Sequence, residues 1–187
     1  MLRLRGVLVA IASIALAASV AAPANADSAT FKDKRGDLRG GFDIQSVSVD
    51  NNGRRVSVKS THRNIRKNMF RRSGSVSAYI DIAKRRKGPE FIIAGPVGFD
   101  GDYHISKVRR WKMVGKPLRC KSLRFRVNYK RDVVRMSASR RCLDRAYDHK
   151  IGRIRVAVRA SQGRPHGQPR TDWFPKRRHL SQWVRAN

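Results

Sequence analysis

Acidic residues are scarce in this sequence. Against 43 lysines and arginines it has only 13 aspartates and glutamates, and its formal net charge is +30 at pH 7. The imbalance is strongest in residues 103–187, which hold 25 cations and four acids. A surface of this kind repels itself and attracts polyanions. Arginine outnumbers lysine by 30 to 13, which suits bidentate contact with phosphate or carboxylate. Codon bias in a G- and C-rich genome is the alternative explanation of that ratio.

Sequence signatures of catalysis are missing as well. There is no GxSxG motif, no P-loop and no Rossmann glycine pattern. The five histidines are scattered, and no two of them have the spacing of metal ligands. His104, on an expected strand, is a candidate general base, although a surface or core position is the simpler interpretation. The sequence favours a protein that is not an enzyme, and it leaves open a hydrolase whose catalytic residues meet only in the fold.

Long apolar runs are absent, with one exception at the N-terminus. Two arginines precede an apolar stretch over residues 7–22, and Ala24-Asn25-Ala26 supplies the small residues that signal peptidase accepts. The stretch is shorter than the roughly 20 residues that a spanning helix needs. We therefore expect residues 1–26 to be a cleaved signal peptide, with no membrane span after cleavage. The protein is expected to be secreted, either extracellular or associated with the cell wall.

Cysteine occurs only twice, as Cys120 and Cys142. An even number of cysteines in an exported chain favours a disulfide. Residues 123–129 and 134–138 alternate between apolar and polar side chains around a polar turn, which predicts a β-hairpin centred on Arg131. The two cysteines lie equally far from that centre, so the hairpin would bring them together. A reactive or metal-binding thiol pair is the alternative.

Short alternating segments separated by turn residues extend along the rest of the chain. No segment keeps a helical period over three turns. About eight short strands with regular turns are typical of a β-sandwich or barrel. We expect an all-β fold, an antiparallel jelly-roll-like β-sandwich, as a single domain over 27–187 with an irregular C-terminal segment at 163–187. The strand signals lie at 47–49, 56–58, 76–82, 91–94, 103–108, 111–114, 123–129, 134–138 and 154–160.

The alternation also predicts where some arginines point. When the apolar side chains of a strand face the core, the side chains between them face outward. If three of the strands are neighbours, six guanidinium groups share one sheet face, and an anion would relieve their repulsion. An ordinary solvated face is the alternative. The candidate anion-binding residues are Arg124, Arg126, Arg135, Arg153, Arg155 and Arg159.

Four aspartates form a candidate metal site. Carboxylate oxygens suit calcium, which takes about six to eight oxygen ligands, although the spacing is not that of an EF-hand. Salt bridges to arginine and turn capping are the simpler interpretation, so we expect no cofactor, with calcium as the one alternative. The four residues are Asp33, Asp37, Asp43 and Asp81.

The three tryptophans lie close to basic residues. Trp111 follows the basic segment 107–110, and Trp173 and Trp183 flank the cations at 176–178. Aromatic rings between cations suit stacking on sugars or bases together with phosphate contact. In a sandwich of this size, however, we expect at least two of the three rings to lie in the core or to cover it.

A set of short motifs spans most of the chain after residue 27. It consists of Asp33, Gly36-Asp37, Asp43-Ile44, Val47, Val49, Tyr79-Ile80-Asp81, Gly88-Pro89-Glu90-Phe91, Tyr129, Asp132-Val133-Val134-Arg135, Arg141-Cys142-Leu143, Asp172-Trp173 and Ser181-Gln182-Trp183-Val184. The set resembles a family of small secreted actinobacterial proteins of unassigned function. Its opening is similar, more distantly, to β-sandwich modules of the DOMON and family 9 carbohydrate-binding type. That likeness implies paired carboxylates, sometimes around calcium, but Ala83 stands where a second strand aspartate is expected.

Together these features predict a secreted, non-enzymatic, cationic β-sandwich that binds an anionic polymer or glycan of the cell envelope. Cell-wall teichoic acid, acidic polysaccharide and extracellular nucleic acid are the candidate ligands, whereas export argues against chromosomal nucleic acid. Two alternatives stay open. One is a secreted hydrolase acting on cell-wall material, and the other is a calcium-dependent carbohydrate-binding module.

Overall fold

The chain forms twelve β-strands and one short helix within the residues that the structure describes. In this computed structural model those residues are 27–34, 36, 38, 42–66, 74–84, 86–98, 101–163 and 167–186. The expected signal peptide lies outside them. The elements are β1 (Ser28–Lys32), β2 (Ile44–Asn51), β3 (Arg55–His62), β4 (Gly74–Asp81), β5 (Phe91–Val97), β6 (His104–Arg109), β7 (Lys112–Val114), β8 (Arg124–Asn128), β9 (Val133–Ser139), α1 (Arg140–Tyr147), β10 (Arg153–Gln162), β11 (Arg170–Phe174) and β12 (Val184–Arg185).

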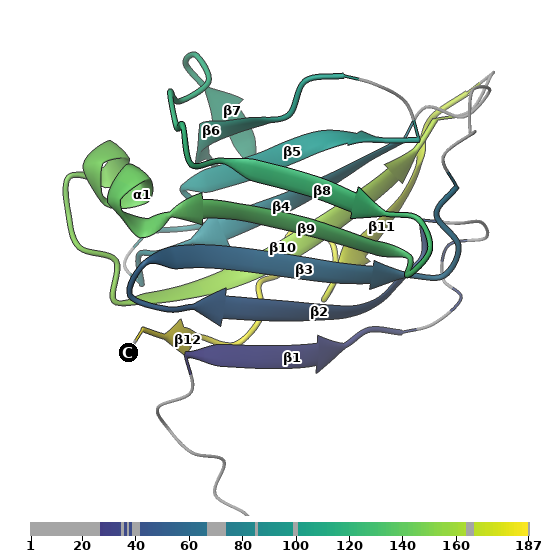
Figure 1. Ribbon diagram of the computed structural model, residues 1–187, viewed down its shortest axis with the longest axis horizontal. Coiled ribbons are helices and arrows are strands. Elements are labelled where there is room, and N and C mark those ends of the chain that lie inside the picture. The colour runs from purple at the N-terminus through teal and green to yellow at the C-terminus, as the bar shows by residue number, and fades with distance from the viewer. Residues whose placement is uncertain are drawn as a thin grey trace, which may run out of the picture.

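The strands form two antiparallel sheets that pack face to face, as Figure 1 shows with the first sheet toward the viewer. The first sheet has the order β1-β2-β3-β9-β8, and the second has the order β11-β10-β4-β5-β6-β7. β12 adds to the start of β10 in the second sheet. This is the antiparallel β-sandwich that the sequence predicts, with twelve strands in place of about eight.

Aliphatic side chains fill the space between the sheets. Val56 and Val134 from the first sheet and Ile80 and Val156 from the second are fully buried. Each lies on a strand whose neighbouring residues in the chain point outward, because side chains alternate between the two faces. The hydrophobic core therefore occupies the inner face of each sheet. A ligand can reach only the two outer faces, the open edges and the ends of the sandwich.

The expected hairpin is formed by β8 and β9. Asn128 is directly opposite Val133, which places the turn at 129–132, around the predicted centre. Cys120 precedes β8 and Cys142 lies in α1 directly after β9, and the two are joined in a disulfide with their Cα atoms 5.9 Å apart. The predicted hairpin and the predicted disulfide are both confirmed.

The helix and the C-terminal strands depart from the expectation. α1 begins after Ser139, whose hydroxyl accepts a hydrogen bond from the backbone N–H of Cys142 at 3.2 Å. It has eight residues, too few to show a sustained helical period, and only Leu143 is buried. The segment 163–187, expected to be irregular, contains β11 and β12, both of which pair with β10. Among the described residues, no helix has the length and apolar character needed to cross a membrane.

Candidate functional site

The structure divides the six candidate arginines between the two sheets. Those of β8 and β9 lie in the first sheet, whereas those of β10 lie in the second, whose outer face points the opposite way. β10 pairs with β4 and not with β9. The outward direction follows the predicted alternation, but the six residues do not share one face, because β10 is not a neighbour of β9. The first group is Arg124, Arg126 and Arg135, and the second is Arg153, Arg155 and Arg159.

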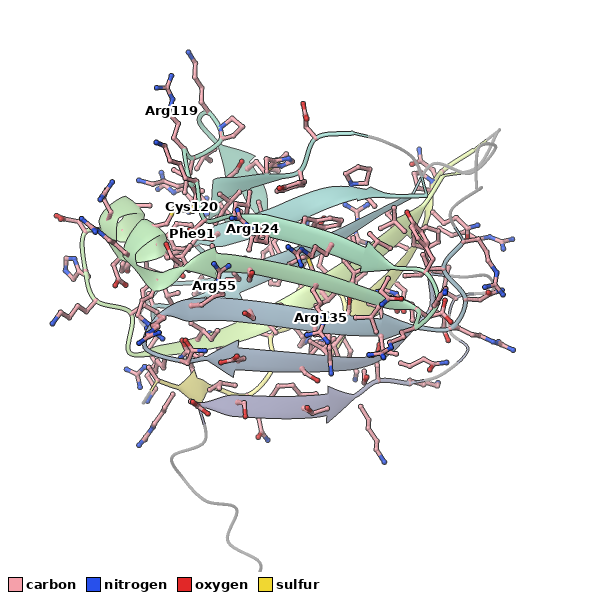
Figure 2. The ribbon with its side chains drawn as sticks, viewed as in Figure 1. Arg55, Phe91, Arg119, Cys120, Arg124 and Arg135 are labelled. Carbon is pink, nitrogen blue, oxygen red and sulfur yellow. A yellow bond between two sulfur atoms is a disulfide. The ribbon has the colours of Figure 1, made fainter. Side chains whose placement is uncertain are left out.

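Three cations stand in a row on the outer face of the first sheet. Arg135 on β9 is directly opposite Lys59 on β3 and Arg126 on β8. Neighbouring strands lie about 4.8 Å apart, so like charges in register repel one another. Figure 2 shows Arg135 and Arg124 projecting from this face. Within the described part of the chain none of the three cations in the row contacts a carboxylate, so the face offers open positive charge.

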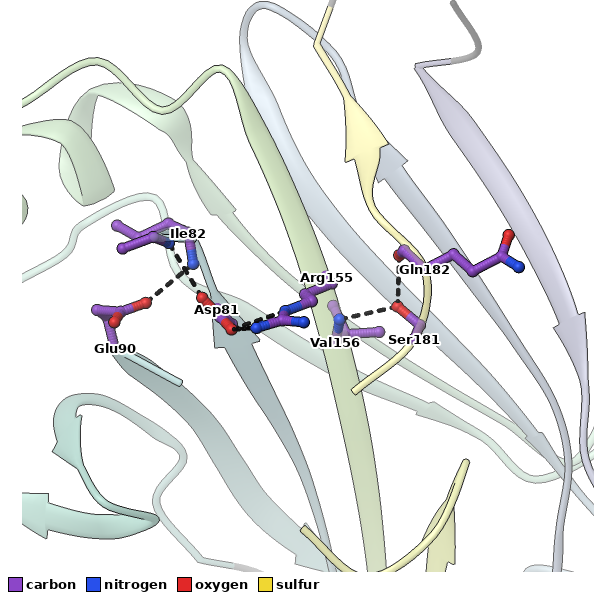
Figure 3. A network of polar contacts seen from close by, with 8 residues as sticks. Asp81, Ile82, Glu90, Arg155, Val156, Ser181 and Gln182 are labelled. Atoms are coloured by element: carbon purple, nitrogen blue, oxygen red, sulfur yellow. Dashed lines mark hydrogen bonds and ion pairs between the residues drawn. The ribbon is translucent and has the colours of Figure 1, made fainter. Parts of the chain in front are cut away.

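The arginines of β10 make more contacts with other side chains than those of β8 and β9. The Nε and Nη2 atoms of Arg155 lie 2.8 and 2.7 Å from Oδ2 of the buried Asp81 (Figure 3). The guanidinium of Arg155 also lies over the ring of Trp183, 4.6 Å from its centroid, and that of Arg159 lies 5.8 Å from the centroid of Trp173. Because Asp81 balances the charge of Arg155, Arg155 itself adds little free positive charge to this side of the sandwich.

The candidate metal ligands do not converge in the described part of the chain. Asp43 accepts hydrogen bonds from the backbone N–H groups of Gly36 and Leu38 at 3.1 and 3.2 Å. It follows Phe42, whose ring touches Gly74 at one end of β4. Asp81 is the last residue of the same strand, roughly 23 Å away at 3.3 Å per residue. Asp37 lies outside the described residues. Within those residues no group of three or more histidines, cysteines and acids could hold a metal ion.

A basic cleft opens between the loop after β4, the β6–β7 hairpin and the C-terminal end of α1. Its volume is about 820 Å³. Five cations line it, against only two acids, Glu90 and Asp148, and the ring of Tyr147 forms part of its wall. The guanidinium of Arg86 lies over that ring, 5.4 Å from its centroid. A concave surface with one dominant sign of charge concentrates the field and attracts ions of opposite charge. The five cations are Arg86, Lys87, Lys107, Arg109 and Arg110.

A buried pair of carboxyl groups borders the cleft. Oε2 of Glu90 accepts a hydrogen bond from the backbone N–H of Ile82 at 2.9 Å, and Oδ1 of Asp81 accepts one from Ala83 at 3.0 Å (Figure 3). The two carboxyl groups also interact with each other. Burial, with the charge of Asp81, raises the pKa of Glu90 to about 7. Burial also raises the pKa of Asp81, while Ala83 and Arg155 oppose the shift. Below a pH of about 7 the Glu90 carboxyl therefore keeps its proton beside the cleft.

The tryptophans cover the outer face of the second sheet rather than the central core. The ring of Tyr79 on β4 lies 5.1 Å from that of Trp111 and 5.5 Å from that of Trp173, measured between centroids. Trp111 and Trp173 are only partly buried, and so is Trp183. The small outer cluster fixes the β6–β7 turn against the sheet, and this places Arg109 and Arg110 at the cleft.

None of the histidines that the structure describes lines the cleft. His62 is buried, and its ring hydrogen bonds to Oγ of Ser60 at 2.8 Å and to the carbonyl oxygen of Phe42 at 3.2 Å. Burial lowers its pKa to about 4. His104, the candidate general base, lies on β6 opposite Ala94 and is not among the residues that line the cleft.

Part of the cleft could be found in the sequence and part could not. The segment 107–111 was predicted as a possible ligand contact because Trp111 follows a run of basic residues there. Glu90 and Tyr147 gave no comparable signal, since each became relevant only when the loop after β4 met the end of α1. The basic run at 84–87 was the one local hint of that loop.

Comparisons with known protein families, with curated proteins and with solved structures find no match. The function is therefore argued from the geometry of the site.

Proposed function

We propose that the chain is a secreted, non-enzymatic, cationic β-sandwich that binds an anionic polymer or glycan of the cell envelope. The observation that carries this proposal is the cleft, where five cations surround a hollow of about 820 Å³. Pockets that hold ligands are concave and carry a few convergent polar groups. The row of Lys59, Arg135 and Arg126 supports the proposal, since a polyanion would relieve its repulsion.

The charge of the cleft depends on Glu90. Below a pH of about 7 its carboxyl holds a proton, so Glu90 then no longer offsets the charge of the five cations that line the cleft. An anionic group entering the cleft meets cations on the loop after β4 and on the β6–β7 hairpin. Binding of this kind is mainly electrostatic, and it weakens steeply as salt rises because bound counterions are released.

The proposal is tested with a labelled heparin oligosaccharide as a soluble anionic glycan. The double variant K107Q/R109Q removes two cleft cations from an exposed strand, and K32Q/R54Q removes the same charge from distant exposed positions. The cleft variant is expected to bind at least tenfold more weakly at low salt, with the slope of log K against log salt smaller by about 1.5. If the distant variant loses as much affinity as the cleft variant, or the parent chain leaves heparin unbound at low salt, the proposal fails.

A second candidate function, a hydrolase acting on cell-wall material, is favoured by one specific observation. Glu90 borders the cleft and keeps a proton up to a pH of about 7, as a general acid must if it is to protonate a leaving oxygen while water attacks the bond. Release of reducing ends from purified cell walls by the parent chain, lost in Glu90→Gln with polyanion binding retained, would support this function. Wall material left intact by the parent chain would exclude it.

A further inference from the structure

The β6–β7 hairpin and the segment after it form the most cationic stretch of the described chain. Residues 107–121 contain seven lysines and arginines and no acid. Apolar side chains alternate with these cations. In Figure 1 the hairpin and the loop that follows it stand out from the body of the sandwich. The seven cations are Lys107, Arg109, Arg110, Lys112, Lys116, Arg119 and Lys121.

Two neighbouring apolar side chains on this hairpin are open to solvent. Met113 is 58% exposed and Val114 is 40% exposed, and of the other large apolar residues only Tyr103 is comparably exposed within the described part of the chain. Both lie on β7, the last strand of the second sheet, whose outer edge pairs with no other strand of the described chain. Consecutive residues of a strand point to opposite faces, so the two side chains flank this open edge, with Val114 on the face that lines the cleft.

The turn of the hairpin is anchored to the second sheet by Trp111. Arg110 and Trp111 form its two-residue turn with φ of 49° and 66°, a left-handed conformation that bulky residues adopt at a cost. Asn-Gly is the usual choice at such a turn. Trp111 offsets the cost by packing on Tyr79 and Trp173, with centroids 5.1 and 5.9 Å away. The anchored turn leaves the edge of β7 directed away from the sheet.

We propose that this hairpin docks the protein on an anionic phospholipid surface. Met113 and Val114 enter the interface between headgroups and acyl chains, and the surrounding lysines and arginines contact headgroup phosphates. Cations beside apolar side chains are the composition of interfacial membrane segments, and long basic side chains bury their stems while the charged ends stay in water. Each cation near an anionic leaflet strengthens binding about fivefold.

The exposed apolar pair decides between a lipid surface and a soluble polymer. A polyanion is held by the cations alone, whereas a bilayer also takes up apolar side chains. The inference therefore goes beyond the proposed function, and the two can fail separately. Loss of the Met113 side chain, which is not among the side chains that line the cleft, weakens binding to lipid without changing binding to heparin, while loss of hairpin cations weakens both.

The test is cosedimentation with vesicles of phosphatidylglycerol and phosphatidylcholine, one part to two, at physiological ionic strength. It uses the chain from Asp27, which contains every strand and helix described, so that the apolar N-terminal run does not contribute. M113S, whose side chain is exposed and whose thermal melting should match the parent, is expected to bind these vesicles about tenfold more weakly. K112Q/K116Q is expected to lose about fivefold for each cation. K32Q/R54Q controls for net charge.

Two results would overturn the inference. One is a parent chain that sediments no better with anionic vesicles than with pure phosphatidylcholine. The other is an M113S variant that binds anionic vesicles as tightly as the parent, because the attraction would then be purely electrostatic. If the parent chain binds heparin but not anionic vesicles, the proposed function stands and this inference is refuted. If it binds anionic vesicles but not heparin, this inference stands and the proposed function is refuted.

Discussion

Replacing Glu90 with glutamine is expected to stabilise the protein in alkaline solution and to leave its stability unchanged in acid. Burial and the charge of Asp81 raise the pKa of Glu90 from 4.5 to about 7. A carboxyl whose pKa is higher in the folded chain contributes stability below its unfolded pKa, and that contribution is lost as the pH rises through the folded value. The difference of about 2.5 between the two pKa values corresponds to about 3 kcal/mol. The glutamine amide stays neutral, accepts from the N–H of Ile82 and donates to Asp81.

The assay is urea denaturation of parent and variant at about pH 4 and about pH 8.5, because these values bracket both pKa values of Glu90. The variant should match the parent at the lower pH and exceed it by about 3 kcal/mol at the higher pH. Asp148→Asn is the matched control, since it removes the other acidic side chain of the cleft from an exposed position, and it should not raise the stability at the higher pH as Glu90→Gln does. A stability difference for Glu90→Gln that does not change with pH would refute the reasoning.

Three further substitutions test the core and the disulfide. Burial lowers the pKa of His62 from 6.5 to about 4. The free energy of unfolding of the parent should therefore fall by about 3 kcal/mol as the pH falls between these two values. Urea denaturation at several pH values should show that this loss is absent in His62→Asn. Gly74→Ala would drive a Cβ into the buried ring of Phe42, and thermal denaturation should report a loss of about 2 kcal/mol. Replacing Cys120 and Cys142 by serine removes a cross-link between residues 22 positions apart in the chain. Denaturation should show that the free energy of unfolding falls by about 3 kcal/mol.

Local patterns were sufficient to predict the hairpins and the disulfide. β8 and β9 are consecutive in the chain, so their alternation, their polar turn and the flanking cysteines all lie within 23 residues, Cys120 to Cys142. The strand signals at 47–49 and 56–58 are also close together in the chain, and the structure pairs β2 with β3 antiparallel there. α1 was not predicted because a helix of eight residues with one buried side chain has too few apolar positions to show a helical periodicity in the sequence.

Long-range pairing could not be predicted from the same patterns. Alternation shows which side chains of a strand are apolar, but it does not show which strand lies alongside. β10 carries three outward arginines as expected, yet its partners are β4, β11 and β12, in the sheet opposite β8 and β9. The cleft was hidden for the same reason, since the residues that line it come from segments 86–91, 107–114 and 146–148.

The structure gives a physical reason for the preference for arginine over lysine. Several guanidinium groups donate to backbone carbonyl oxygens instead of carboxylates. Arg140 donates to the carbonyl groups of Asn51 and Asn52 at 3.1 Å, and also to that of Ile151. Arg124 donates to carbonyl groups in the segment 121–123 at 3.0 and 2.9 Å. A planar fork with five N–H donors can reach several carbonyl groups at once, whereas an ammonium group acts as a point charge.

Hydrogen bonding to a carbonyl satisfies the donor without cancelling the charge. Residues 27–187 contain 41 lysines and arginines and 13 acids, so at least 28 cations have no carboxylate of their own. Some of the acids are also used elsewhere: Asp43 binds the backbone N–H groups of Gly36 and Leu38. Arginines such as Arg140 can therefore cross-link the fold while the surface stays strongly positive. Codon bias alone would not place backbone carbonyl groups where they accept from a guanidinium. These hydrogen bonds let one residue type contribute both to stability and to the attraction of anions.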